Sequence, residues 1–441
     1  MHAGDILMKM NICEKEDGRR SCEMEDVFAD LYGEEEEILS RQRLRYTQAV
    51  EAFFKAFPDH GSDAEISVFS APGRTEIGGN HTDHQHGRVL AAAIDLDAIA
   101  VVSENGENVI RLLSEGYPLS LVDLSDFSPR EEERGTSSSL IRGVAAQFAE
   151  RGVALRGLDI YMTSDVLSGS GLSSSAAFEV LMGTILDTLF NDGKAGAVEI
   201  AKFGQKAENV YFGKACGLMD QMVSSVGGFV KIDFSDTEDP KIRKYECDLE
   251  KAGLALIVTD TGGSHADLSG EYSAIPQEMK KVAAFFGKEY LREVDEEDFY
   301  RSLPELVKAP DISDRAILRS VHFFSDDKRV EEEAEALEEG DIAGFLKFVN
   351  ASGRSSETLL QNLYCNAVPE EQKIPLALML SRRVLGKEGA CRVHGGGFAG
   401  TIQAFVPKSK VAEYKETLEA VFGEEACHIL RIRQAGGIRI F

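Results

Sequence analysis

The chain has 441 residues, 43% of them hydrophobic, and a formal net charge of -27. A chain of this length can bury a large core and predicts two domains. Such an acidic chain repels nucleic acid and anionic membrane surfaces, so neither is an expected partner. The seven scattered cysteines contain no C-x-x-C pair, and the charged N-terminus lacks a hydrophobic signal region. Both features predict a cytoplasmic protein with free thiols.

The first quarter of the chain predicts a helix, a short strand and a polar loop. Residues 38–57 predict the helix, and residues 65–69 predict the strand. Residues 70–87 contain proline and several glycines, which predicts a loop. The charged and polar side chains of this loop are Arg74, Asn80, His81, Asp83, His84 and His86. The histidines and the carboxylate could form a transition-metal site, which is one alternative for this segment.

A glycine- and serine-rich stretch follows two more strands (89–102 and 109–113) and an amphipathic helix (137–150). This stretch lies between an apolar strand at 158–162 and a helix at 178–190. A strand–turn–helix with glycines presents backbone N–H groups and the positive end of a helix, which suits a phosphate group. The lysine of the Walker A pattern is absent, and a small-residue turn at a helix N-terminus is the alternative interpretation.

The middle of the chain predicts a helix at 198–211 that contains Glu208, a short helix beginning at 215–222, and a strand at 229–234. The polar residues 235–249 indicate a domain boundary. The second half alternates strands and helices, which predicts a mixed α and β protein whose sheet order the pattern leaves open. Its expected strands are 254–259, 401–406 and 428–432, and its expected helices are 311–324, 330–339, 342–349, 372–385 and 411–422.

Four motifs, in this order, resemble those of galactokinases in the GHMP small-molecule kinase superfamily. They are Pro72-Gly73-Arg74 through His81-Thr82-Asp83, the run Gly169–Ser175, the segment Cys216-Gly217-Leu218-Met219-Asp220-Gln221, and Gly395-Gly396-Gly397-Phe398. The resemblance covers about 65–406. It implies an α+β fold with two GHMP kinase domains, which we expect at 1–245 and 246–441, and an active site in the cleft between them.

The resemblance also implies an ATP- and Mg²⁺-dependent kinase that phosphorylates the anomeric hydroxyl of galactose. Asp220 would lie beside that hydroxyl, as a proton acceptor or as an orienting group, with Arg74 next to it. The implied sugar ligands are Asn80, His81, Thr82, Asp83, Gly217 and Tyr272. The implied phosphate-binding residues are Gly169, Ser170, Gly171, Leu172, Ser173, Ser174 and Ser175. The implied Mg²⁺ ligands are Ser175 and Glu208, since hydroxyl and carboxylate oxygens suit that ion.

One departure bears on the substrate, because family members have glutamate where this chain has Asn80. An amide can serve either an alcohol or an acid, so a C6-oxidised sugar such as galacturonate is an alternative to galactose. A non-catalytic sugar sensor is a further alternative, which Ser173, Glu208 and Asp220 argue against. A small-molecule sugar is the expected partner, and a monomer is the expected state. The structural alternatives are a surface carboxylate for Glu208, a dipole-stabilised carboxylate at a helix N-terminus for Asp220, a structural ion pair for Arg74 and a packing role for Tyr272.

Overall fold

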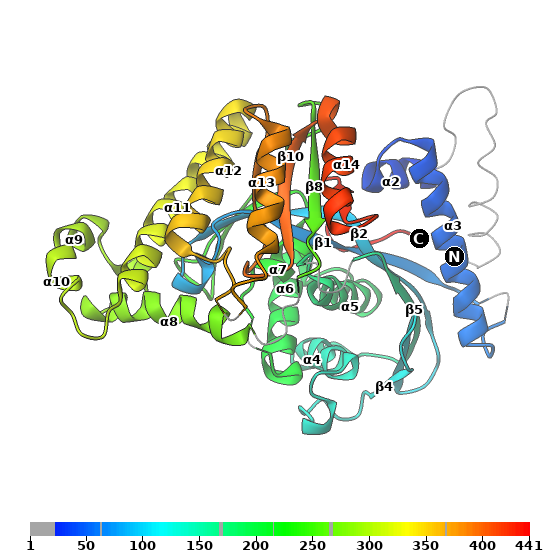
Figure 1. Cartoon of the computed structure of the whole chain (residues 1–441). Coiled ribbons are helices and arrows are strands. Elements are labelled where there is room, and N and C mark those ends of the chain that lie inside the picture. Colours follow the sequence, from blue (N-terminus) through cyan, green and yellow to red (C-terminus); the bar gives the residue numbers. More distant parts are fainter. Residues whose placement is uncertain (1–22, 62–63, 167–170, 215, 264–267, 367) are drawn as a thin grey trace.

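The computed structural model describes residues 23–61, 64–166, 171–214, 216–263, 268–366 and 368–441. These residues form two β-sheets with helices packed around them (Figure 1). The first sheet has eight strands and the second has four. The expected α+β class is therefore confirmed. The proposed division at 245/246 falls between the last strand before the chain leaves the first sheet and the first strand of the second.

The first sheet is built on two long antiparallel strands, β1 (Ser67–Gly78) and β2 (Arg88–Glu104). Its main path runs β12-β1-β2-β5-β3-β4, and β6 and β7 extend it from the other end of β2. The remaining strands of this sheet are β3 (Val109–Ser114), β4 (Ser120–Asp123), β5 (Leu158–Ser164), β6 (Phe229–Asp233), β7 (Lys241–Tyr245) and β12 (Ile438–Arg439). Because β12 pairs with β1, the end of the chain returns to the first half.

The expected loop at 70–87 is wrong in its first half, because β1 continues through Pro72 and Gly73 to Gly78. The pairing of β1 with β2 shifts register between Pro72 and Arg74 and again between Glu76 and Gly78. The shifts leave Gly73 and Ile77 without a ladder partner, whereas Pro72 lies opposite Asp97, and such bulges re-aim the side chains beside them. The proline and glycines that predicted a loop therefore mark two irregularities inside a strand.

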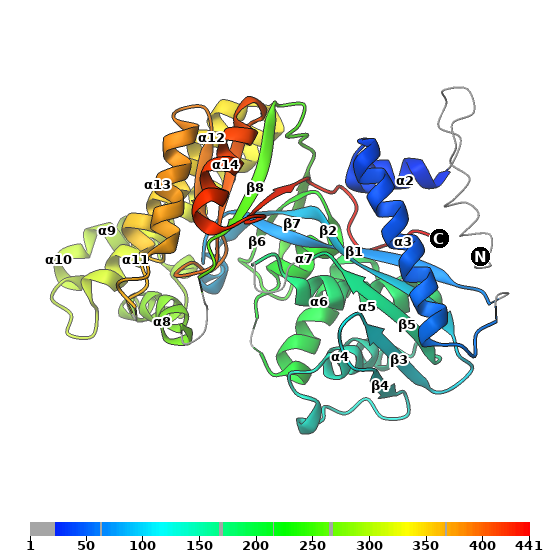
Figure 2. The same cartoon turned by 45° about the vertical axis from the view of Figure 1, so that its right-hand side comes forward.

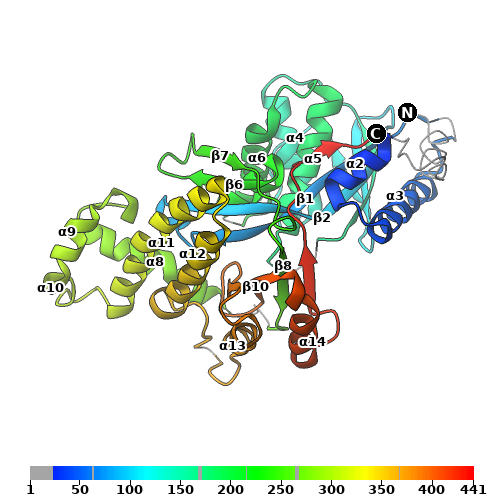
Figure 3. The same ribbon diagram turned by 90° about the horizontal axis from the view of Figure 1, so that it is seen from above.

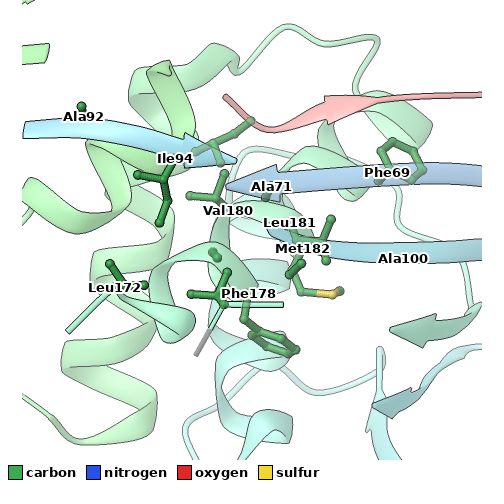
Figure 4. Close-up of a cluster of buried hydrophobic side chains, with 14 of the residues drawn as sticks. Phe69, Ala71, Ala92, Ile94, Ala100, Leu172, Phe178, Val180, Leu181 and Met182 are labelled. Carbon is green, nitrogen blue, oxygen red and sulfur yellow. The ribbon is translucent and has the colours of Figure 1, made fainter. Parts of the chain in front are cut away.

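One face of the first sheet is covered by α4 (Ser137–Glu150), α5 (Ser174–Phe190), α6 (Gly196–Lys206) and α7 (Met219–Val226). The core between them alternates along the strands: Phe69 and Ala100 face these helices, whereas Val68 and Ile99 face the other way. Figure 4 shows Phe178, Val180, Leu181 and Met182 of α5 against this face, and α5 is buried along most of its length. A helix that is apolar on most sides can only lie in the interior.

The opposite face carries α2 (Glu23–Tyr32) and α3 (Glu36–Ala56), which lie beside the sheet in Figure 2. A buried carboxylate, Asp97 of β2, holds this layer to the sheet. Asp97 accepts hydrogen bonds from Arg45 of α3 (2.6 Å), Tyr32 of α2 (2.6 Å), Arg433 (3.0 Å) and Ser70. The N-terminal helices, the sheet and the C-terminal segment therefore meet at one charged group.

The second sheet has the order β11-β8-β10-β9. Its strands are β8 (Leu254–Asp260), β9 (Ala390–Val393), β10 (Thr401–Pro407) and β11 (Cys427–Leu430). Two helices, α13 (Lys373–Leu385) and α14 (Val411–Phe422), pack on one of its faces. Seen from above, β1 and β2 run through the middle of the molecule, with α11 (Asp314–Glu339) and α12 (Ile342–Ser355) towards one end and α2 and α3 at the other (Figure 3).

The expected helices at 311–324 and 330–339 are a single helix, α11 (Asp314–Glu339). The polar residues between them contain neither proline nor glycine, and Asp326 and Asp327 are buried against partners from other segments. Tertiary ion pairs therefore keep the helix continuous through a polar stretch that the sequence alone predicts as a break between two helices. The other C-terminal helices are α8 (Ser269–Phe285), α9 (Glu296–Arg301), α10 (Leu303–Leu306) and α12 (Ile342–Ser355). Within the described part of the chain, no helix combines the length and the apolar character needed to cross a bilayer.

Replacing Arg433 tests the Asp97 cluster. The substitution Arg433→Met removes one of the two guanidinium groups on a buried carboxylate, and we expect it to lower the free energy of unfolding by about 3–5 kcal/mol. Arg301→Met is the control, because the pair of Arg301 with Asp298 lies in solvent and exposed pairs contribute about 0–1 kcal/mol. Urea denaturation of the two variants measures both values, and equal losses would contradict a special role for Asp97.

Candidate active site

The centre of the site is an ion pair between Arg74 of β1 and Asp220 of α7. Arg74 Nε donates to Asp220 Oδ1 at 2.8 Å, and Nη2 donates to Oδ2 at 2.6 Å, which is the two-pronged geometry of a strong pair. Ser173 Oγ donates to the same Oδ2 at 2.5 Å. Three of the motifs found in the sequence therefore converge on one carboxylate.

Each of these side chains is placed by a local backbone feature. The bulge after Pro72 positions Arg74, and Asp220 lies in the first turn of α7, where the helix dipole stabilises negative charge. Ser173 has φ 64° and ψ 60°, a left-handed conformation that costs a non-glycine residue energy. The contact with Asp220 holds it in this conformation immediately before α5. The strain therefore lies at the candidate site.

The pKa of Asp220 lies below the usual value of a carboxyl group. Burial alone would raise it, but the charge and hydrogen bonds of Arg74 outweigh burial, with smaller contributions from Ser173 and Lys214. Asp220 is therefore ionised at neutral pH, and its two oxygens already accept three hydrogen bonds.

The glycine- and serine-rich turn is fixed to β1 beneath it. Arg74 N donates to the carbonyl of Leu172 at 3.0 Å, and Arg74 Nη1 donates to the carbonyl of Gly171. A side chain at Gly73 would lie 2.9 Å from Leu172 O, so glycine is needed for this close approach. Ser174 and Ser175 open α5 and are half-buried. Gly169 and Ser170 lie outside the described residues.

The expected sugar-binding loop lies next to Asp220. A Cβ at Gly217 would be 2.9 Å from Asp83 Oδ2, which places the two residues side by side. His81 Nε2 donates to the carbonyl of Gly396 at 2.9 Å. Burial and the neighbouring His84 lower the pKa of His81 to about 4, so this histidine is neutral at physiological pH. Thr82 is fully buried and bonds within its own loop, to Gly79 O and Arg88 O.

Tyr272 of α8 and the second glycine turn form the opposite wall. Tyr272 OH donates to the carbonyl of Gly397 at 2.9 Å, and a Cβ at Gly396 would lie 2.6 Å from the tyrosine ring. The turn therefore approaches Tyr272 as closely as glycine allows. His394, just before it, joins the two halves: Nε2 bonds Thr75 at 3.0 Å and Nδ1 bonds Thr401 at 2.9 Å.

Asn80 is placed behind this wall. Its side chain is fully buried, and its amide nitrogen donates to Glu76 and to the carbonyl of Gly395, each at 2.8 Å. Its oxygen accepts from Asn362 at 2.8 Å and from Ser356 at 3.3 Å. All of its hydrogen-bonding capacity is therefore used by protein groups, which leaves none for a ligand in this conformation.

Glu208 lies in a π-helical turn, η3 (Ala207–Phe212), that continues α6. Its Oε2 accepts from Gln221 at 3.0 Å and its Oε1 from Lys214 at 2.8 Å. The same Gln221 nitrogen donates to the buried Glu179 at 2.9 Å. A nearly buried carboxylate that already holds a cation fits a hard divalent ion, as does a hydroxyl such as that of Ser175.

The histidine-rich loop does not bring its side chains together around a metal. The ring of His86 stacks on Tyr290 at 3.6 Å, and His81 is committed to Gly396. Among the described residues, no group of three or more His, Cys, Asp or Glu side chains could hold a metal ion. The transition-metal alternative is therefore wrong for the part of the loop that the structure describes.

The sequence missed several residues of the site. Gln221 was part of a recognised motif, but its bridge between Glu179 and Glu208 depends on the packing of three helices. Lys214 precedes the same motif and carries no signal of its own. Glu76 and Arg392 form a buried ion pair at 2.9 Å across the two halves. No spacing rule connects residues 316 positions apart.

Replacing His394 tests the burial of this neutral histidine. Burial and the charges of Arg74 and Arg392 lower the pKa of His394 to about 3. The unfolded chain takes up a proton near pH 6.5, so stability is lost as the pH falls below that value. For wild type, this term removes about 1.4 kcal/mol between pH 7.5 and pH 5.5. We expect His394→Gln to lack this term, which urea denaturation at the two pH values measures. An unchanged pH dependence would mean that His394 is not held neutral.

Two family models match the chain. The GHMP kinases N terminal domain matches residues 139–228, and the galactokinase galactose-binding signature matches residues 51–104. These ranges contain the loop with Arg74 and Asp83, the serine-rich turn, and Asp220.

Two similar proteins are galactokinases, one from Actinobacillus pleuropneumoniae serotype 5b (strain L20) and one from Streptomyces coelicolor. Each is 32% identical, over 367 and 378 residues respectively, which is 82% and 85% of this chain and 91% and 93% of theirs. Among solved structures, Lactococcus lactis galactokinase complexed with galactose is similar, with a TM-score of 0.73 and 21% identity over 88% of this chain and 99% of that one. Methanococcus jannaschii mevalonate kinase shares the fold at a TM-score of 0.60 and 15% identity, over 83% and 98% of the two chains. The agreement in sequence over nine tenths of these relatives shows that the chain belongs to the galactokinase family of GHMP kinases.

Proposed function

We propose that this chain transfers the γ-phosphoryl group of ATP to the anomeric hydroxyl of galactose. The observation that carries the proposal is the convergence of Arg74, Ser173 and Asp220 beside the loop that contains Asp83. Phosphoryl transfer depends on positioning and on neutralised charge more than on covalent chemistry. The fixed carboxylate of Asp220 can position the hydroxyl. The guanidinium of Arg74 and the N-terminus of α5 can neutralise charge.

In this mechanism, Asp220 orients the sugar hydroxyl by accepting its hydrogen bond. A carboxylate has about four acceptor positions, and three are taken by Arg74 and Ser173. The lowered pKa makes Asp220 a weak base, so orientation is favoured over full proton removal before the transfer. Arg74 would remain on Asp220 and stabilise the negative charge that develops as the hydroxyl attacks.

The nucleotide would lie over the N-terminus of α5. The backbone from Gly171 to Ser174, together with the helix dipole, supplies donors and positive potential for its phosphates. Ser175 and Glu208 would hold Mg²⁺, which neutralises phosphate charge when it is bound. Lys214 and Gln221 set the position of the Glu208 carboxylate.

A neutral sugar suits the site better than an acidic one. The proposed sugar position lies beside two carboxylates, Asp83 next to Gly217 and Asp220, and Arg74 is committed to Asp220. Asn80 has no free donor for a C6 carboxylate, because Glu76 and Gly395 use both of its N–H groups. We therefore favour galactose over galacturonate, and we assign to Asn80 an indirect role in positioning the loop. A cytoplasmic location and a monomeric state stay predictions from the sequence.

Asp220→Asn tests the assignment of the central carboxylate. The amide keeps the shape but loses the charge and one acceptor face, so we expect kcat to fall on the order of a thousandfold. Binding of ATP should remain, because Asp220 is assigned to the sugar hydroxyl. Asp192→Asn, at an exposed position, is the matched control and should keep full activity. Full turnover by Asp220→Asn would remove Asp220 from the mechanism.

The substrate is tested by ADP release with Mg-ATP and galactose, galacturonate, 2-deoxygalactose, glucose or no sugar. We expect galactose to exceed galacturonate in kcat/KM by about a hundredfold or more, because like charges placed together cost several kcal/mol. A preference for galacturonate would move the substrate while keeping the reaction. Sugar binding without any turnover would instead support a sensor.

A further inference from the structure

Lys214 contacts the candidate metal ligand Glu208, and the mechanism above uses it only to position that carboxylate. Its ammonium group is 2.8 Å from Glu208 Oε1. The two side chains differ sharply in exposure, since 61% of Lys214 is exposed but only 4% of Glu208. The carboxylate is therefore anchored in the protein, whereas its counter-ion approaches from the solvent side.

The backbone directs this lysine toward the carboxylate. Gly213 ends the π-helical turn in a left-handed conformation at φ 86°, and the N–H of Lys214 donates to the carbonyl of Glu208 at 3.1 Å. Gln221 fixes the other carboxylate oxygen from the interior. The pair is therefore built into the turn, unlike an exposed ion pair formed by two free side chains.

Lys214 is the counter-ion of Glu208 in a region that is rich in carboxylates. Gln221 Nε2 donates to both Glu179 and Glu208, which places these two carboxylates side by side, and Asp220 directly precedes Gln221 on α7. Arg74 is bound to Asp220 and to the carbonyl of Gly171. Among the described residues, Lys214 is the cation that pairs with Glu208. Without it, a nearly buried negative charge would face the position expected for the ATP phosphates.

We propose that Lys214 is an exchangeable counter-ion of the phosphate-transfer site. It neutralises Glu208 when no divalent ion is bound, and it gives up Oε1 and turns to the nucleotide phosphates when Mg²⁺ binds. This inference rests on the proposed function, because it takes Glu208 as the Mg²⁺ ligand. Lys214 is thus a positioning and charge-balancing residue, and its side chain is exposed enough to move between the two partners.

The inference predicts a coupling between Lys214 and Mg²⁺ in nucleotide binding. Without metal, the loss of Lys214 leaves Glu208 to repel the phosphates, because an unpaired, poorly solvated charge interacts strongly with its neighbours. With metal, Mg²⁺ supplies the missing positive charge. Removing the lysine should therefore harm binding mainly in the absence of metal.

The experiment measures binding of a non-hydrolysable ATP analogue by calorimetry, in EDTA and in Mg²⁺, without sugar. We expect Lys214→Met to weaken binding about tenfold in EDTA, or about 1.4 kcal/mol, and less than about threefold in Mg²⁺. Lys214→Arg should restore binding in EDTA, since it keeps the charge. Lys206→Met is the matched control, because Lys206 lies on α6 and pairs with the exposed Glu150. It should match wild type under both conditions.

Two outcomes would overturn the inference, and they are distinguishable. If Lys214→Met changes binding equally in EDTA and Mg²⁺, or in neither, Lys214 has no coupling to the metal and the proposed function stands. If the wild-type chain binds no nucleotide under either condition, the proposed function is wrong and the inference falls with it. Thermal unfolding of each variant checks that the fold is intact.

Discussion

The buried ion pair between Glu76 and Arg392 joins the two halves of the molecule. Glu76 belongs to β1 of the first sheet and Arg392 to β9 of the second, and the guanidinium also donates to the carbonyl of Ile77. Loss of one partner in such a pair leaves an uncompensated charge in the interior, which costs about 3–5 kcal/mol. The relative position of the two walls of the active site therefore depends on this contact.

A single strand carries one partner of the Arg74–Asp220 pair and one partner of the Glu76–Arg392 pair. Arg74 and Glu76 are two positions apart on β1; Arg74 reaches Asp220 in its own half, and Glu76 reaches across to Arg392. Between them, Thr75 bonds His394 and Gln403 of the second half. These three consecutive residues lie between the two bulges of β1 and pair in regular register with β2, so their side chains alternate between the faces of the strand. A shift in this strand would disturb charge neutralisation and domain position together.

The position of Asn80 changes how the sequence difference from the family is understood. If the side chain at this position contacted the sugar, the replacement of glutamate by Asn80 would change the substrate. In this chain the amide instead links Glu76, the carbonyl of Gly395 and Asn362 in the interior. A carboxylate here would face Glu76 and a carbonyl oxygen, both acceptors, so the two residues form a matched pair. In the proposed function, Asp83 and Asp220 set the charge beside the sugar.

The sequence by itself determined the local elements and the candidate residues of the site. Apolar periodicity placed α4 (Ser137–Glu150) and the core of α5, and the motifs identified Arg74, Asp83, Ser173 and Asp220, because these features depend on neighbours within a few residues. Only the tertiary structure decided the course of β1 through Pro72, the continuity of α11, the enclosure of Asn80, and the partners of Glu208. Each of these depends on charges or hydrogen bonds from distant segments, and burial strengthens such contacts enough to override local turn signals.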